Sequence, residues 1–102
     1  MEIIEHIEKE RSLLPEYKKE AELKLVNHIK KRLMETITLN PFINEWIIDI
    51  ILDQIKHLNR EEIFQILSDF AEKQRLKVII EHKYKYSSVY SACFSVLEDD
   101  KN

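Results

Sequence analysis

The chain contains no glycine in 102 residues, and this absence limits its folds and its chemistry more than any other feature of the sequence. Glycine enters left-handed backbone conformations most easily, so phosphate-cradling loops and dinucleotide-binding turns depend on it. P-loop and Rossmann-type nucleotide chemistry are therefore excluded. The lack of glycine also disfavours the tightest hairpin turns.

Length and composition predict a single domain over residues 1–102 with one hydrophobic core. Apolar residues make up 44% of the chain and recur throughout it, which argues against disorder. No apolar run reaches the length of a membrane-spanning helix, and the acidic start Met1-Glu2 does not resemble a signal peptide. We therefore expect a cytoplasmic protein without a membrane partner. Cys93 is the only cysteine, so no internal disulfide can form.

The first forty residues have helical periodicity. Apolar residues share one face over residues 3–14, and Pro15 either opens a second helix or kinks a continuous one. After Pro15 an apolar stripe advances four residues at a time, through Tyr17, Ala21, Leu25, Ile29, Leu33 and Ile37.

The segment over residues 41–58 predicts a central helix. Asn40 suits a helix N-cap and Pro41 the first helical position. Apolar residues would cover most of the circumference of this helix, so other parts of the chain or a second copy must enclose it. These residues are Phe42, Ile43, Trp46, Ile47, Ile48, Ile50, Ile51, Leu52, Ile55 and Leu58.

A further helix is predicted to begin at Asn59 and to continue to about Arg75. Asn59 and Glu62 have the spacing of a capping box, in which each side chain bonds the backbone of the other residue. Behind them Ile63, Leu67 and Phe70 form one apolar face.

Residues 77–97 permit two interpretations. Val78, Ile80 and Tyr84 alternate with charged residues, and a second alternating run follows from Tyr90, which together favour a β-hairpin turning near residues 87–88. Val89, Tyr90, Cys93, Phe94 and Leu97 also fit a helical stripe. We favour the hairpin, so the predicted fold is mainly α, with three to four amphipathic helices and a C-terminal two-stranded β-hairpin. The alternative is an all-α bundle.

The sequence shows no constellation of catalytic or metal-binding residues. The four histidines have no ligand spacing among them, and Cys93 has no adjacent base. Neighbouring carboxylates such as Asp49 and Asp53 fit the polar edge of a helix. We therefore expect no metal, no cofactor and no enzymatic activity.

A basic and aromatic segment favours a nucleic-acid hypothesis as the alternative function. Basic groups bind phosphates and tyrosines stack on bases, so a hairpin after three helices would resemble a winged helix. The residues are Lys73, Arg75, Lys77, Lys83, Tyr84, Lys85 and Tyr86. The acidic residues that precede the segment, Glu61, Glu62, Asp69 and Glu72, argue against a recognition helix there.

Protein–protein contact is the interpretation that we prefer. Phe42 and Trp46 are aromatic types that anchor interfaces, and the segment that contains them has more apolar surface than a small domain easily hides. We expect a small regulator, inhibitor or adaptor that forms a homodimer and binds a protein partner through these residues.

Overall fold

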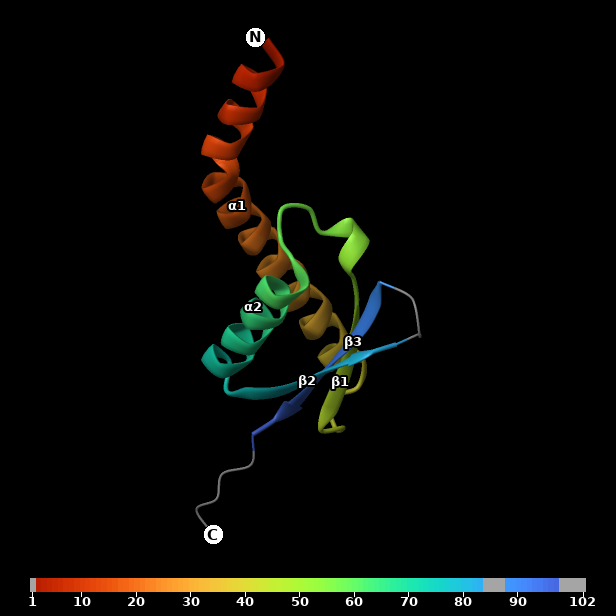
Figure 1. The fold of residues 1–102 in the computed structure, drawn as a ribbon. Coiled ribbons are helices and arrows are strands. Elements are labelled where there is room, and N and C mark those ends of the chain that lie inside the picture. Colours follow the sequence, from red (N-terminus) through yellow and green to blue (C-terminus); the bar gives the residue numbers. More distant parts are fainter. Residues whose placement is uncertain (1, 84–87, 98–102) are drawn as a thin grey trace.

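The computed structural model describes residues 2–83 and 88–97. They form a three-stranded antiparallel sheet and two α-helices, one of them very long (Figure 1). In chain order the elements are α1 (Glu2–Leu39), β1 (Glu45–Ile51), the 3₁₀ turn η1 (Leu52–Gln54), α2 (Arg60–Lys73), β2 (Leu76–His82) and β3 (Val89–Val96). The fold is therefore α/β. More residues lie in helices than in strands, as expected, but the described residues form two α-helices rather than three or four, and the expected hairpin is part of a three-stranded sheet.

The three strands follow the order β1-β3-β2, and β3 pairs antiparallel with both neighbours. β1 and β2 are consequently parallel to each other, and α2 connects them before the chain returns through β3 in the centre of the sheet. Both strands expected in the C-terminal part are present, and they pair over Leu76–His82 and Val89–Val96.

The central helix predicted over residues 41–58 is wrong, because most of that segment is the edge strand β1 and the turn η1. Exposure alternates along β1: Trp46, Ile48 and Ile50 are buried, whereas Ile47 is 62% exposed. Isoleucine is branched at Cβ and packs well on a pleated sheet, which favours the strand. Pro41 lies in the turn before β1 and does not begin a helix.

Helix α1 runs without interruption through Pro15, so this proline neither ends the helix nor opens a new one. Only Leu25, Ile29 and Leu33 of α1 are buried, in the stripe that the sequence predicted. The first turns of α1 project beyond the sheet and α2, and Ile3 is exposed there (Figure 1). The long helix therefore contributes only its C-terminal half to the core.

Helix α2 begins with the capping box that the sequence predicted. The Glu62 amide donates to Asn59 Oδ1 at 2.8 Å, and the Asn59 amide donates to Glu62 Oε1 at 3.0 Å. Lys18 Nζ of α1 donates to Glu62 Oε2 at 2.7 Å. The hydrogen bond from Lys18, followed by the one from Asn59, lowers the pKa of Glu62 below its usual value. One carboxylate thus connects the start of α2 to α1.

Within the described part of the chain, two residues occupy the left-handed backbone region, His57 with φ of 70° and Arg75 with φ of 57°. Arg75 lies directly after the cap of α2, where helices commonly end on a left-handed residue. A side chain at such a position costs about 1 kcal/mol relative to glycine. The chain therefore makes turns of the kind that glycine usually makes, without any glycine.

Both helices cover the same face of the sheet, and the core lies between them and this face. The core consists of Leu25, Ile29, Leu33, Trp46, Ile48, Ile50, Ile63, Ile66, Leu67, Phe70, Ala71, Ala92 and Phe94. In the centre of the core the rings of Phe70 and Phe94 meet edge to face at 6.0 Å. No described element covers the opposite face of the sheet. Neither α1 nor α2, the α-helices of the described residues, has the apolar length that crossing a membrane requires.

Candidate protein-binding surfaces

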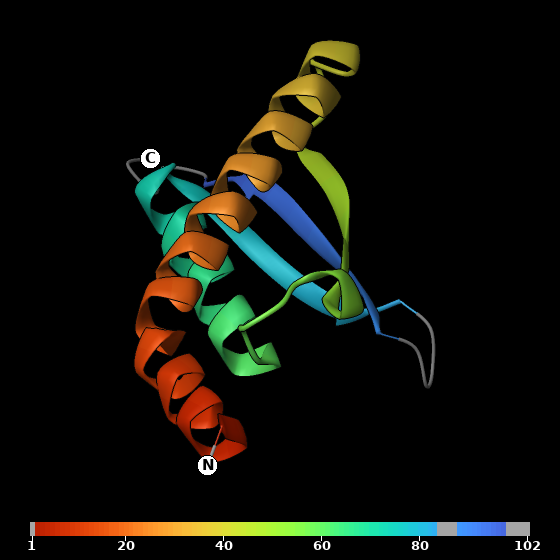
Figure 2. The ribbon, with the colours of Figure 1, turned by 90° about the horizontal axis from the view of Figure 1, so that it is seen from above.

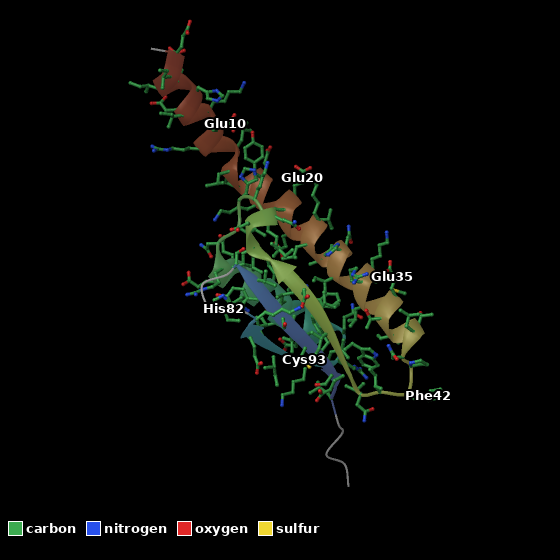
Figure 3. All side chains as sticks on the ribbon, turned by 90° about the vertical axis from the view of Figure 1, so that its right-hand side faces the viewer. Glu10, Glu20, Glu35, Phe42, His82 and Cys93 are labelled. Atoms are coloured by element: carbon green, nitrogen blue, oxygen red, sulfur yellow. The ribbon has the colours of Figure 1, made fainter. Side chains whose placement is uncertain are left out.

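A group of exposed apolar side chains lies at the end of the molecule where α1 passes into β1 and β3 ends. Phe42 is 97% exposed and projects from the connecting turn (Figure 3). The Val96 amide donates to the Asn44 carbonyl at 3.4 Å, which brings the end of β3 beside this turn. The group, called the end patch below, consists of Leu39, Phe42, Ile43, Val96 and Leu97.

Trp46, the second predicted partner-binding residue, lies in the core with 5% of its surface exposed. Its indole Nε1 donates to the Asn40 carbonyl at 3.0 Å. The side chain therefore fixes the turn between α1 and β1 and does not face outward. Of the two aromatic residues, only Phe42 is placed where a partner can contact it directly.

The predicted basic segment does not form one surface within the described residues. Lys73, Arg75 and Lys77 lie near the start of β2, whereas Lys83 follows its other end. Lys83 Nζ contacts Asp49 Oδ2 at 2.6 Å, so its charge is partly neutralised.

The remaining residues of that prediction, Tyr84, Lys85 and Tyr86, lie outside the described residues. Helix α2, which precedes the basic segment, exposes the carboxylates of Glu61, Asp69 and Glu72. These acidic groups repel phosphates. The nucleic-acid interpretation stays a prediction without a specific structural observation in its favour.

A groove of about 650 Å³ lies between α1 and the free edge of β1, and the sequence analysis did not anticipate it. In Figure 2, α1 and β1 diverge from the turn that joins them, and η1 with the following loop crosses the wide end of the space. The groove is lined by Tyr17, Glu20, Ala21, Lys24, Leu25, His28, Ile29, Asp49, Ile50, Ile51, Gln54, Ile55, Lys56 and His57. No alternation in the sequence marks the edge strand that forms one wall, because apolar residues stand at both odd and even positions of β1.

The uncovered face of the sheet carries a short apolar row across its centre. Register places Ile47 and Ile79 on either side of Cys93.

Cys93 Sγ lies 3.8 Å from Glu45 Oε2. Burial, followed by the negative charge of Glu45, raises the pKa of the Cys93 thiol. The thiol is therefore held in its protonated, weakly nucleophilic form.

No group of three or more His, Cys, Asp or Glu side chains within residues 2–83 and 88–97 is arranged to hold a metal ion. Two of the histidines stack on tyrosine rings instead. His57 lies 4.9 Å from Tyr17 and His82 lies 4.6 Å from Tyr90, measured between ring centroids. The His57–Tyr17 contact joins the loop after η1 to α1, and both residues line the groove.

Comparison with known proteins adds no function to this geometry. The chain matches no protein-family model, and neither a curated protein nor a solved structure matches it.

Proposed function

We propose that this chain is a small, non-enzymatic regulator, inhibitor or adaptor that acts through protein–protein contacts in the cytoplasm and forms a homodimer. The observation that carries the proposal is the end patch, with a phenylalanine that is almost completely exposed. Burying an aromatic side chain removes about 150–250 Å² from water, at about 25 cal/mol per Å². Covering Phe42 alone therefore favours association by about 4–6 kcal/mol before the costs of association are subtracted.

The composition of the end patch suits contact with a second copy. Its members carry no charge, so two patches related by a two-fold axis do not repel each other. A stable dimer buries about 800 Å² on each partner, which is more than five side chains provide. The interface therefore extends to polar neighbours such as Asn40 and Asn44, as is usual at the rim of an interface.

Sedimentation velocity over a concentration series tests the homodimer. The wild-type chain is compared with Phe42→Gln and with Leu23→Gln, which removes an exposed apolar side chain from α1 about 24 Å along the helix from Leu39. The wild type and Leu23→Gln should shift from monomer to dimer at the same concentration. Phe42→Gln should need at least about tenfold more protein, which corresponds to a loss of about 1.4 kcal/mol.

Two results would contradict the proposal. If the wild-type chain stays monomeric at every concentration, the homodimer part of the proposal is refuted. Equal effects of both substitutions show that association does not use the end patch. Circular dichroism of each variant establishes that loss of dimer is not loss of fold, and Phe42 is suitable for this purpose because its side chain makes no core contact.

A further inference from the structure

The backbone of β1 presents hydrogen-bonding groups that no described strand uses. Beyond the end of β1, the Leu52 amide donates to the Ser88 carbonyl at 2.9 Å. Along an antiparallel pair, residues whose backbone groups bond the partner strand alternate with residues whose backbone groups point away from it. Since Leu52 bonds the chain at the start of β3, the backbone groups of the even-numbered residues of β1 are directed toward β3. The N–H and C=O groups of Ile47 and Asp49 and the N–H of Ile51 therefore point away from the sheet. Ile51 is the N-cap of η1, so its carbonyl belongs to that turn. An edge of this kind accepts a further strand.

The groove beside β1 extends to this free edge. Asp49 lines the groove, although its side chain lies on the opposite face of the sheet and contacts Lys83 there. The backbone edge of β1 is therefore one wall of the groove. The floor is apolar and includes Leu25 and Ile29 of α1 and Ile50 of β1. A chain lying in the groove would contact both the unpaired backbone of β1 and an apolar surface.

The two acidic residues that line the groove, Glu20 by its side chain and Asp49 by its backbone, already have cationic partners. Glu20 Oε1 lies 3.7 Å from Lys24 Nζ, and Asp49 Oδ2 lies 2.6 Å from Lys83 Nζ. Neither acid therefore contributes a full unpaired negative charge to the groove.

Apart from Tyr17, Asp49 and the Glu20–Lys24 pair, the other ionisable residues that line the groove are His28, Lys56 and His57. Neither Lys56 nor His28 makes a hydrogen bond or an ion pair with any other described residue, and His57 is engaged only through its ring contact with Tyr17. Lys56 follows η1 closely, so its charge lies at the wide end of the groove. Among the charged residues that line the groove, Lys56 is the one without an ion pair to a described residue, and its positive charge complements a carboxylate on a ligand.

We propose that the groove between α1 and β1 binds an extended acidic segment of a partner protein, which adds to β1 as a fourth strand. Its backbone pairs with the outward groups of Ile47, Asp49 and Ile51, an apolar side chain occupies the groove floor, and a carboxylate lies near Lys56. A helical ligand would leave the edge groups of β1 unpaired. The inference rests on the proposed function, since it requires a protein partner, but it uses a surface separate from the end patch.

The probe is a pooled set of fluorescent nine-residue peptides in which glutamate alternates with valine, isoleucine, leucine or phenylalanine. Fluorescence anisotropy should give Kd values of roughly 10–100 µM for the tightest members. A matched set with lysine in place of glutamate should bind at least about tenfold more weakly. In ¹⁵N–¹H spectra the glutamate peptides should shift the amides of Ile47, Asp49 and Ile51.

Backbone N-methylation tests strand addition itself. In an extended peptide, alternate residues direct their N–H groups toward opposite edges. N-methylation of all glutamates, or of all apolar residues, therefore blocks one edge only. One of these two peptides should lose binding and the other should keep it.

Substitutions in the chain test the site. Ile51→Pro removes an outward N–H and leaves the bonds to β3 in place, so peptide binding should fall at least about tenfold. Lys56→Glu should weaken the glutamate peptides to a similar extent, whereas Lys31→Glu, an equal charge change on the outer side of α1, should not. Phe42→Gln should keep peptide binding even though it loses the dimer.

The inference is overturned if no peptide of either set binds at millimolar concentration. It is also overturned if glutamate and lysine peptides bind equally, if both N-methylated peptides bind as well as the parent, or if the shifted amides lie in β2. Shifts in β1 that grow with protein concentration in the absence of peptide, and persist in Phe42→Gln, would assign the edge to a second copy instead. Failure of peptide binding with an intact Phe42-dependent dimer refutes this inference and leaves the proposed function standing.

Discussion

The alternation of burial along β1 leads to a prediction in which adjacent isoleucines behave differently. Ile48 is 3% exposed and faces the helices, whereas Ile47 points to the uncovered face of the sheet. Ile48→Ala should destabilise the fold by about 2–5 kcal/mol, because it removes buried methyl groups and leaves a cavity in the core. Ile47→Ala should cost only about 0.5–1 kcal/mol, which reflects the lower strand propensity of alanine.

Urea denaturation measures both effects. For a small protein the dependence on urea is about 1–3 kcal/mol per molar, so Ile48→Ala should lower the midpoint by about 2 M and Ile47→Ala by about 0.5 M or less. Circular dichroism at 222 nm reports the helices, and the fluorescence of Trp46, which lies on the same strand, reports β1 itself. Coincident transitions by the two probes would support two-state unfolding.

The two substitutions distinguish between an edge strand and the central helix that the sequence predicted for this segment. In a helix enclosed around most of its circumference, both isoleucines would be buried and both substitutions would be severe. Similar losses of 2 kcal/mol or more for both residues would refute β1 as an edge strand with one open face. Similar small losses would show that the segment does not contribute to the core.

Two further predictions concern single side chains. Arg75→Gly should stabilise the fold by up to about 1 kcal/mol, because glycine adopts the left-handed φ of 57° without strain, and a lower thermal midpoint would contradict this. Alkylation of Cys93 by iodoacetamide at pH 8 should be slower than that of a free thiol, because burial and Glu45 raise its pKa. Glu45→Gln should accelerate the reaction by lowering that pKa, whereas an unchanged rate would show that the carboxylate has no influence.

The elements that the sequence predicted correctly are those with local signals. The Asn59–Glu62 capping box places the start of α2, because both hydrogen bonds form within four residues. Strand pairing near the C-terminus is also a short-range event, and the alternation of Val78 and Ile80 with charged residues marks one face of β2. The apolar side of α2 follows directly from its helical spacing.

β1 could not be recognised in this way because its stabilising contacts are distant in sequence. Ile48 pairs with Ala92 of β3, more than forty residues away. The segment has apolar residues at both odd and even positions, so its pattern satisfies a buried helix as well as a strand. Asn40-Pro41 resembled a helix start, but the Asn40 carbonyl instead accepts the hydrogen bond from Trp46. Tertiary contacts outweighed the local signal at this point.

The candidate site was only partly predictable for the same reason. Phe42 was selected from the sequence as an aromatic residue of the predicted central helix, and in the structure it is exposed in the turn before β1. The groove requires β1 to be an edge strand and α1 to pass beside it, and neither arrangement was expected. Because residues 41–58 were assigned to a helix, the groove between α1 and β1 could not be predicted, although the identity of each residue that lines it was known from the sequence.

The two edge strands of the sheet, β1 and β2, differ in how readily a further strand can pair with them. β2 carries Lys77 and Glu81 and is followed by Lys83, and charges of this kind discourage pairing with another chain. β1 also carries charges, at Glu45 and Asp49, but it has no lysine, no proline and no bulge, and its outward residues include Ile47 and Ile51. Such an edge aggregates unless something limits access to it. Helix α1 runs beside β1 and leaves a groove with an apolar floor and the unpaired Lys56 at one end, and in our proposal these features favour one acidic strand over an unselected sheet edge. The position of α1 thus makes selective strand addition, rather than aggregation, the expected behaviour of this edge.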